Sequence, residues 1–107
     1  MADERIPLER KITDEIMSWL RSSGYWACKI HGAAYQTSGL PDIIMIDRNG
    51  RFVGLEVKRP AIGKVTLLQR KTLDLINGAG GYAVVVRSVD DVRRALKGSE
   101  RRDAPWK

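Results

Sequence analysis

Two extended apolar runs joined by a short polar turn constrain this chain more than any other feature. Residues 42–47 are rich in isoleucine, and residues 51–58 form a second extended run. The joining segment reads Asp-Arg-Asn-Gly-Arg, and its Asn-Gly pair is typical of tight turns between antiparallel strands. The sequence therefore predicts a β-hairpin near the middle of the chain.

Helical and extended patterns surround this hairpin. Apolar residues recur at every third or fourth position in three segments, and they alternate or run together in two more. The sequence thus predicts helices over residues 7–23, 66–76 and 89–97, and further strands over residues 25–31 and 82–86. The expected order is α-β-β-β-α-β-α, an α/β fold with a mixed central sheet flanked by helices.

The size and balance of the chain are those of one globular domain, with 107 residues of which 43% are apolar and 30% charged. We expect this domain to span residues 1–98. Residues 99–107 lack periodicity and are rich in basic residues, so we expect them to form a loose basic tail. Cys28 is the only cysteine, which excludes an intrachain disulfide and a cysteine-based zinc site and fits a reducing, intracellular compartment.

Glu56 and Lys58 are charged residues at the end of an otherwise apolar strand. Alternation places both on one face and Val57 on the other. If Asp42 lies beside them, two carboxylates converge in an apolar sheet, and a divalent cation relieves their repulsion. Asp42, Glu56 and the Val57 carbonyl would then hold Mg²⁺ or Mn²⁺, while Lys58 would support the attacking water and the developing negative charge. An exposed Glu56–Lys58 ion pair is the alternative.

A cation shared by Asp42 and Glu56 also requires one hairpin register. A regular two-residue turn would place these side chains on opposite faces of the sheet. A three-residue loop instead pairs Asp47 with Arg51 and brings the two carboxylates opposite each other on the same face. We therefore predict the longer loop, with a positive φ at Gly50.

This set of residues resembles the PD-(D/E)XK nuclease superfamily, and more closely its VRR-NUC branch, which includes stand-alone phage and bacterial proteins. The matching residues, in chain order, are Glu9, Lys29, His31, Gly39-Leu40-Pro41-Asp42, Glu56-Val57-Lys58-Arg59-Pro60 and Gln69. The resemblance implies a restriction-endonuclease-like αβββαβ core, metal-dependent phosphodiester hydrolysis, and cutting of branched DNA such as Holliday junctions. It also implies that Glu9, Asp42, Glu56, Lys58 and Gln69 form the catalytic set, with Glu9 as a further metal ligand.

Two of these positions have competing explanations. Glu9 continues the apolar stripe of the first helix and is preferred to Glu15, although an acid near a helix N-terminus is favourable by itself. Gln69 completes a capping box with Thr66, in which its side chain bonds back to the Thr66 backbone. It equally fits a role in orienting a water or contacting the scissile phosphate. The sequence leaves both explanations of Gln69 open.

The charge balance favours a polyanionic partner, because nineteen Lys and Arg against thirteen Asp and Glu give a net charge of +6. Several cationic or polar residues fall near the expected site, where they would contact the DNA backbone. They are Lys29, His31, Gln36, Arg59, Lys64, Arg70 and Lys71. His31, the only histidine, is placed with these contacts and not in the catalytic set.

The expected function is that of a Mg²⁺- or Mn²⁺-dependent, structure-specific DNA endonuclease. By analogy and geometry, a chain of this size would cover branched DNA best as a two-fold homodimer. The rival functions are a non-catalytic DNA-binding module and an interaction subunit of a repair or packaging assembly. The complete set of Asp, Glu and Lys favours the enzyme. No apolar run approaches the length of a membrane span, so we expect no membrane partner and a cytoplasmic location in a bacterial or phage-infected cell.

Overall fold

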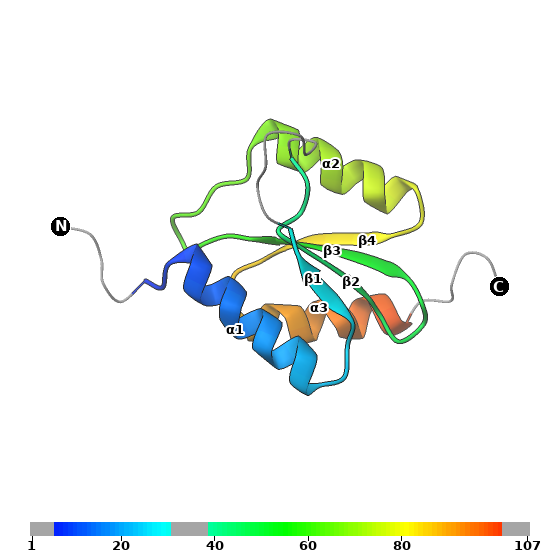
Figure 1. The fold of residues 1–107 in the computed structure, drawn as a ribbon. Helices are drawn as coiled ribbons and strands as arrows, with labels where there is room; N and C mark the ends of the chain where they lie inside the picture. Colours follow the sequence, from blue (N-terminus) through cyan, green and yellow to red (C-terminus); the bar gives the residue numbers. More distant parts are fainter. Residues whose placement is uncertain (1–5, 31–38, 102–107) are drawn as a thin grey trace.

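A computed structural model of the chain describes residues 6–30 and 39–101. Within these ranges, one sheet with the strand order β1-β2-β3-β4 is flanked by helices (Figure 1). The elements are α1 (Glu9–Ser22), β1 (Ala27–Lys29), β2 (Ile43–Ile46), β3 (Phe52–Val57), α2 (Leu67–Gly78), β4 (Tyr82–Val86) and α3 (Val89–Arg101). The first three strands pair antiparallel, and β4 pairs parallel to β3. The predicted element order and mixed α/β sheet are confirmed.

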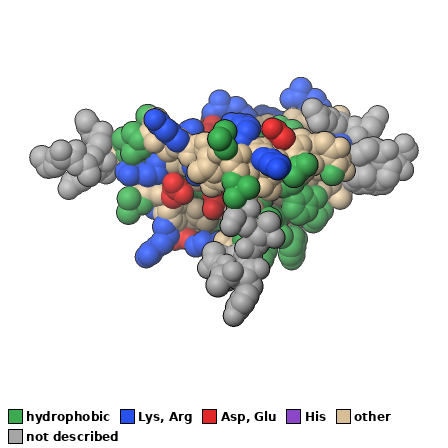
Figure 2. Space-filling model, turned by 90° about the horizontal axis from the view of Figure 1, so that it is seen from above, with side chains coloured by type: hydrophobic (Ala, Val, Ile, Leu, Met, Phe, Trp, Pro, Cys, Tyr) green, Lys and Arg blue, Asp and Glu red, His purple; other side chains and the backbone are tan. Residues whose placement is uncertain are grey.

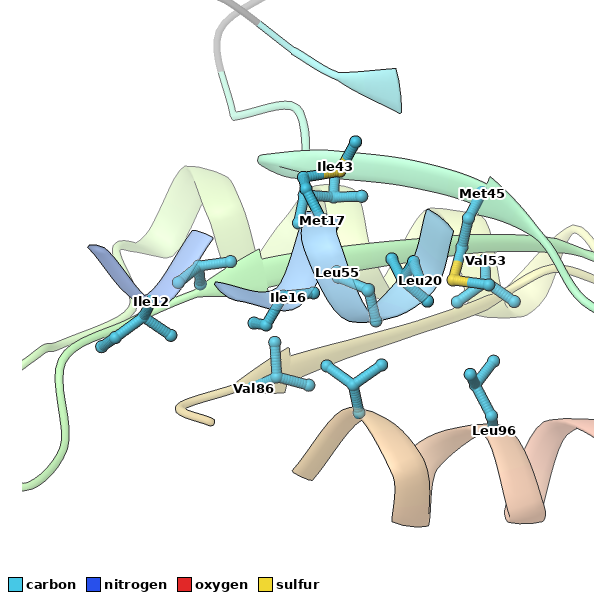
Figure 3. Close-up of a cluster of buried hydrophobic side chains, with 12 residues drawn as sticks. Ile12, Ile16, Met17, Leu20, Ile43, Met45, Val53, Leu55, Val86 and Leu96 are labelled. Carbon is cyan, nitrogen blue, oxygen red and sulfur yellow. The ribbon is translucent and has the colours of Figure 1, made fainter. Parts of the chain in front are cut away.

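The main hydrophobic core lies between the sheet and the pair α1 and α3, whereas α2 covers the opposite face (Figure 1). Helical periodicity puts Ile12, Ile16 and Leu20 on one side of α1, where they are buried. Alternation in the hairpin sends the odd-numbered residues toward these helices. The sheet contributes Ile43, Met45, Val53, Leu55, Val57 and Val86, and α3 contributes Val92 and Leu96 (Figure 3).

The hairpin has the predicted three-residue loop. Ile43 pairs with Leu55 and Ile46 with Phe52, a register that carries Asp47 opposite Arg51. Asp47 N–H donates to the Arg51 carbonyl at 2.9 Å. Gly50 has a φ of +82°, a left-handed conformation that glycine adopts without strain. The register prediction is confirmed, and with it the expectation that Asp42 and Glu56 share one face.

The last helix continues past the predicted stop, since α3 runs to Arg101 and not to residue 97. Gly98 is a packing position and not a helix end, because a Cβ there would lie only 3.1 Å from the Tyr82 hydroxyl oxygen. Ser99 is fully buried. The prediction of a loose tail over 99–107 is therefore wrong for residues 99–101, and residues 102–107 lie outside the described part of the chain.

Ser99 belongs to a buried polar cluster that joins α3 to the hairpin turn. One carboxylate oxygen of Asp47 accepts the backbone N–H groups of Asn49 and Arg51, both at 2.9 Å. The other oxygen accepts the Ser99 hydroxyl. Arg51 Nη1 donates to the Ser99 carbonyl at 3.3 Å. The acid at the start of the turn thus organises the loop and also docks the end of α3.

The outer edge of β4 is covered by a side chain of α2. Asn77 Nδ2 donates to the Ala83 carbonyl, and Asn77 Oδ1 accepts the Ala83 N–H, both at 2.9 Å. The amide therefore pairs with the strand edge as a neighbouring strand would. Helix α2 extends to Gly78, two residues beyond the predicted end, and its last turn therefore includes Asn77.

Across residues 6–30 and 39–101, no helix combines the length and the apolar character needed to cross a membrane.

Candidate active site

Asp42 and Glu56 stand opposite each other at one end of the hairpin. Because Ile43 pairs with Leu55, the next pair toward this end joins Asp42 with Glu56. Their side chains lie on the α2 face, since Ile43 and Leu55 fill the core on the other face. Asp42 Oδ2 accepts the Val57 N–H at 2.8 Å, which fixes this carboxylate against the end of β3.

Pro41 leaves the Val57 carbonyl without a donor from the neighbouring strand. One further step in the register places Pro41 opposite Val57, in the same type of pair as Asp47 and Arg51, where the Asp47 N–H donates to the Arg51 carbonyl. Pro41 has no N–H and cannot donate to the Val57 carbonyl. The Val57 oxygen therefore keeps its acceptor capacity beside the two carboxylates, as the predicted third metal ligand requires.

Glu56 is buried, with only part of its hydrogen-bonding capacity used. The residue is 1% exposed, and its Oε2 accepts Gln69 Nε2 at 2.9 Å and lies 3.6 Å from Lys58 Nζ. Oε1 has no hydrogen-bond partner among the described residues. Burial, and next the adjacent Asp42 carboxylate, raise the pKa of Glu56 to about 8, against the opposing effect of Lys58.

The donor set fits an oxygen-ligated divalent cation. A buried oxygen without a hydrogen-bond partner lowers the stability of the fold. A carboxyl group with a raised pKa lies in surroundings that disfavour its negative charge. One lysine cannot balance two carboxylates. A cation held by Asp42, Glu56 and the Val57 carbonyl would supply the missing charge and the missing partner of Glu56 Oε1.

The raised pKa of Glu56 predicts that the stability of the metal-free protein depends on pH. Between the ordinary value of 4.5 and about 8, the folded chain retains a proton that the unfolded chain releases. The free energy of unfolding therefore falls as pH rises through this window. In EDTA, we expect the melting temperature to fall further from about pH 6 to about pH 9 for the wild type than for Glu56→Gln, which does not ionise. Equal decreases in the two proteins would contradict the shift.

Gln69 completes the predicted capping box and also contacts the candidate site. Its Oε1 accepts the Thr66 N–H at 3.0 Å, and its own N–H donates to Thr66 Oγ1 at 3.1 Å, which completes the capping box. The amide nitrogen then points at Glu56 Oε2. The cap at the start of α2 therefore orients the group that holds Glu56.

Lys58 is 8% exposed and lies beside Glu56, not in a solvated surface pair. Its N–H donates to the Val86 carbonyl at 3.0 Å, so the β3–β4 ladder continues to this residue. The predicted grouping of Asp42, Glu56, Lys58 and Gln69 is present in the structure.

Glu9 does not join this group. It is exposed at the first position of α1, and among the described residues no three His, Cys, Asp or Glu side chains are grouped closely enough to hold a metal ion. The neighbouring Leu8 is also exposed. The start of α1 therefore lies outside the hydrophobic core, although Glu9 continues the apolar stripe of the helix. The structure therefore does not support Glu9 as a metal ligand, and Glu15 is exposed as well.

The predicted DNA contacts have different surroundings. The Arg59 guanidinium donates to the carbonyls of Ile6 and Pro7, which gives it a structural task at the start of α1. Lys29 forms an ion pair with Asp14 at 3.6 Å. Three more cations, Lys64, Arg70 and Lys71, are exposed, whereas His31 and Gln36 lie outside the described residues.

All three described helices begin at the end of the sheet that carries Glu56 (Figure 1). Arg59 bonds the segment before α1, Gln69 in the first turn of α2 bonds Glu56, and α3 starts just after Val86, the partner of Lys58. The positive ends of three helix dipoles therefore point toward this region, which favours an anion such as phosphate.

The comparisons with known proteins give a likeness of fold. No protein-family model matches the sequence, and no curated protein matches it. A solved structure described as "VRR_NUC domain protein" superposes with a TM-score of 0.74 at 19% identity, covering 89% of each chain. Another, described as "VRR_NUC domain", gives a TM-score of 0.69 at 21% identity over 83% of this chain and 94% of the other. The fold that the resemblance implied is thus confirmed.

Proposed function

We propose that this chain, which has the fold of VRR_NUC domains, is a metal-dependent nuclease that hydrolyses DNA phosphodiester bonds at Asp42, Glu56 and Lys58. The observation that carries the proposal is the buried Glu56 carboxylate, which has one oxygen without a hydrogen-bond partner among the described residues and lies next to a second acid and a lysine. A merely structural ion pair would not require the second, repelling carboxylate.

The residues divide the task by their chemistry. Asp42, Glu56 and the Val57 carbonyl would hold Mg²⁺ or Mn²⁺, which when bound lowers the pKa of an attacking water and stabilises charge on the phosphoryl group. Lys58 presents a positive charge to the developing negative charge and orients the water. Gln69 keeps the Glu56 carboxylate in one orientation through its 2.9 Å hydrogen bond.

DNA is the polyanion that we propose as the substrate. The net charge of +6 and the helix N-termini near Glu56 favour phosphate groups at this end of the sheet. The exposed cations Lys64, Arg70 and Lys71 would hold the backbone, whereas Arg59 is engaged within the protein. Phosphate contacts fix position without reading sequence, so we propose recognition of DNA shape, with branched DNA such as a Holliday junction as the preferred substrate.

A homodimer would suit a branched substrate, and an apolar half of the sheet supports it. Helix α2 contacts β3 and β4 and leaves Trp26, Ile46 and Phe52 side by side on the same face, with Trp26 59% exposed. Hydrophobic side chains gather on the right of this side of the molecule in Figure 2. These three side chains carry no charge, so two positively charged copies can meet there.

We expect sedimentation velocity to show a dimer, and Phe52→Glu to give monomers; a monomeric wild type would contradict this.

The function is tested by incubating the pure protein with labelled duplex, flap and four-way-junction DNA in Mg²⁺, Mn²⁺ or EDTA. We expect cleavage with either metal, none in EDTA, and the fastest cleavage of the junction. Lys58→Met, purified in parallel, controls for contaminating nucleases, because it lacks the proposed lysine and should not cleave. If the wild type cleaves no substrate with either metal, the non-catalytic DNA-binding module replaces the nuclease.

Gln69→Glu separates the two roles of Gln69. The new carboxylate keeps the acceptor for the Thr66 N–H but places an oxygen against Glu56 Oε2. We expect cleavage to fall by about 10- to 100-fold, as when other groups that orient a metal ligand are changed. Gln69→Ala also loses the acceptor for the Thr66 N–H but keeps the backbone bond to Thr66 Oγ1, and should cost about 0.5–1 kcal/mol of stability in urea denaturation. Full activity of Gln69→Glu would leave only the capping role.

A further inference from the structure

Arg87 holds closed the turn that follows Lys58. This turn spans residues 59–63. The Gly63 N–H donates to the Arg59 carbonyl at 3.1 Å, and Ala61 has a φ of +65°. Arg87, directly after β4, donates from Nη1 to the carbonyl oxygens of Arg59 at 2.5 Å and Gly63 at 2.9 Å. Two carbonyl oxygens that converge on one point repel each other, so a cationic donor between them stabilises the closed turn.

This closed turn packs on the Lys58 side chain. A Cβ added to Gly63 would lie 2.9 Å from Lys58 Cβ, which means that the Gly63 backbone presses on the stem of the lysine. On the other side, Lys58 N–H is bonded to the carbonyl of Val86, the residue just before Arg87. Lys58 is therefore fixed by β4 through its own N–H and by Arg87 through the turn.

Arg87 is itself anchored at the start of α3. Its N–H donates to Asp91 Oδ2 at 2.8 Å, and Asp91 N–H donates to Ser88 Oγ at 3.1 Å. Beyond the turn, the Arg59 side chain donates to the Pro7 carbonyl at 3.0 Å. Two guanidinium groups in series thus connect α3, the turn after Lys58, and the start of α1.

We propose that Arg87 is a positioning residue for Lys58, which it holds beside Glu56 by clamping the 59–63 turn. The proposal deepens the nuclease function and rests on it. Arg87 Nη1 is directed at backbone carbonyls and requires no contact with DNA or metal. Its loss should therefore lower the rate of the chemical step and leave the affinities for DNA and metal nearly unchanged.

Arg87→Ala tests this with single-turnover cleavage, DNA binding in EDTA, and thermal melting. We expect the cleavage rate to fall about 100-fold, the scale set by a small misplacement of a catalytic group, with DNA affinity within about twofold. Guanidinium ion at low millimolar concentration should restore part of the rate by occupying the vacated position. Arg94→Ala removes the same charge from an exposed ion pair on α3 and should cleave like the wild type.

Hydrogen exchange at Gly63 N–H gives a readout that does not depend on activity. Exchange should be faster in Arg87→Ala and slower again with guanidinium ion. Unchanged exchange, a near-wild-type rate in the variant, or a loss of rate that only follows the loss of folded protein without rescue would each overturn the proposal. An inactive wild type would instead defeat the nuclease function, while the exchange result would still decide whether Arg87 closes the turn.

Discussion

Glu56→Gln should abolish cleavage while leaving the fold intact. The amide has the size of the carboxyl group and can still accept the Gln69 hydrogen bond, but it removes the charge that holds the cation. We expect turnover with Mg²⁺ or Mn²⁺ to fall by at least about 10³-fold, the scale of losing a group that supports transition-state charge. Metal affinity, measured by calorimetry, should fall with it.

The same substitution should not weaken DNA binding in EDTA. Removing a negative charge near the phosphate path leaves affinity unchanged or raises it, and fluorescence anisotropy would measure this. Asp74→Asn removes an exposed acid from α2 and serves as the matched control that keeps wild-type turnover. Near-wild-type turnover of Glu56→Gln would remove Glu56 from the mechanism.

The largest effect on stability is expected for Asp47→Ala, at the opposite end of the hairpin. Asp47 is buried and accepts hydrogen bonds from two backbone N–H groups and from the Ser99 hydroxyl. Alanine would leave these three donors without their acceptor, and those of Arg51 and Ser99 are buried, at a cost of about 3–5 kcal/mol. That is a large fraction of the roughly 5–15 kcal/mol by which a typical domain is stable.

Urea denaturation would measure this loss. Asp47→Asn keeps an oxygen for the two N–H groups and should lose less stability than Asp47→Ala. Asp90→Ala, in an exposed ion pair with Arg94, should stay within about 0.5 kcal/mol of the wild type. If Asp47→Ala unfolds at the same urea concentration as the wild type, the buried cluster contributes nothing measurable.

Local chemistry explains what could be predicted from the sequence. The hairpin register follows from residues close in the chain, because an Asp at the turn start and a left-handed glycine select one loop length. That register alone brings Asp42 and Glu56 together. The capping box of Gln69 is local as well, so the capping role and its partner Thr66 could be predicted.

The parts that could not be predicted depend on contacts between distant segments. Gly98 looks like a helix stop, but the Tyr82 side chain that packs on it comes from another element. Arg87 follows a strand without any motif, and its partners, the carbonyls of Arg59 and Gly63, carry no side-chain signal. Glu9 fits the periodicity of α1, yet periodicity does not say how far a helix projects past its sheet.

The Asn77 amide on the β4 edge limits how this sheet can be enlarged. It occupies both backbone groups of Ala83, and the Asp91 carboxylate takes the Arg87 N–H two alternate positions further on. Of these alternate outward positions, Val85 alone, between Ala83 and Arg87, has both its N–H and its carbonyl left to pair with another strand. One residue is too little for another chain to form a β-ladder at this edge. Among the described strands, the other edge of the sheet is β1, so we expect added strands, from an appended domain or during misassembly, to attach there and not at β4. In evolution or in design, growth of the described sheet is therefore disfavoured at β4.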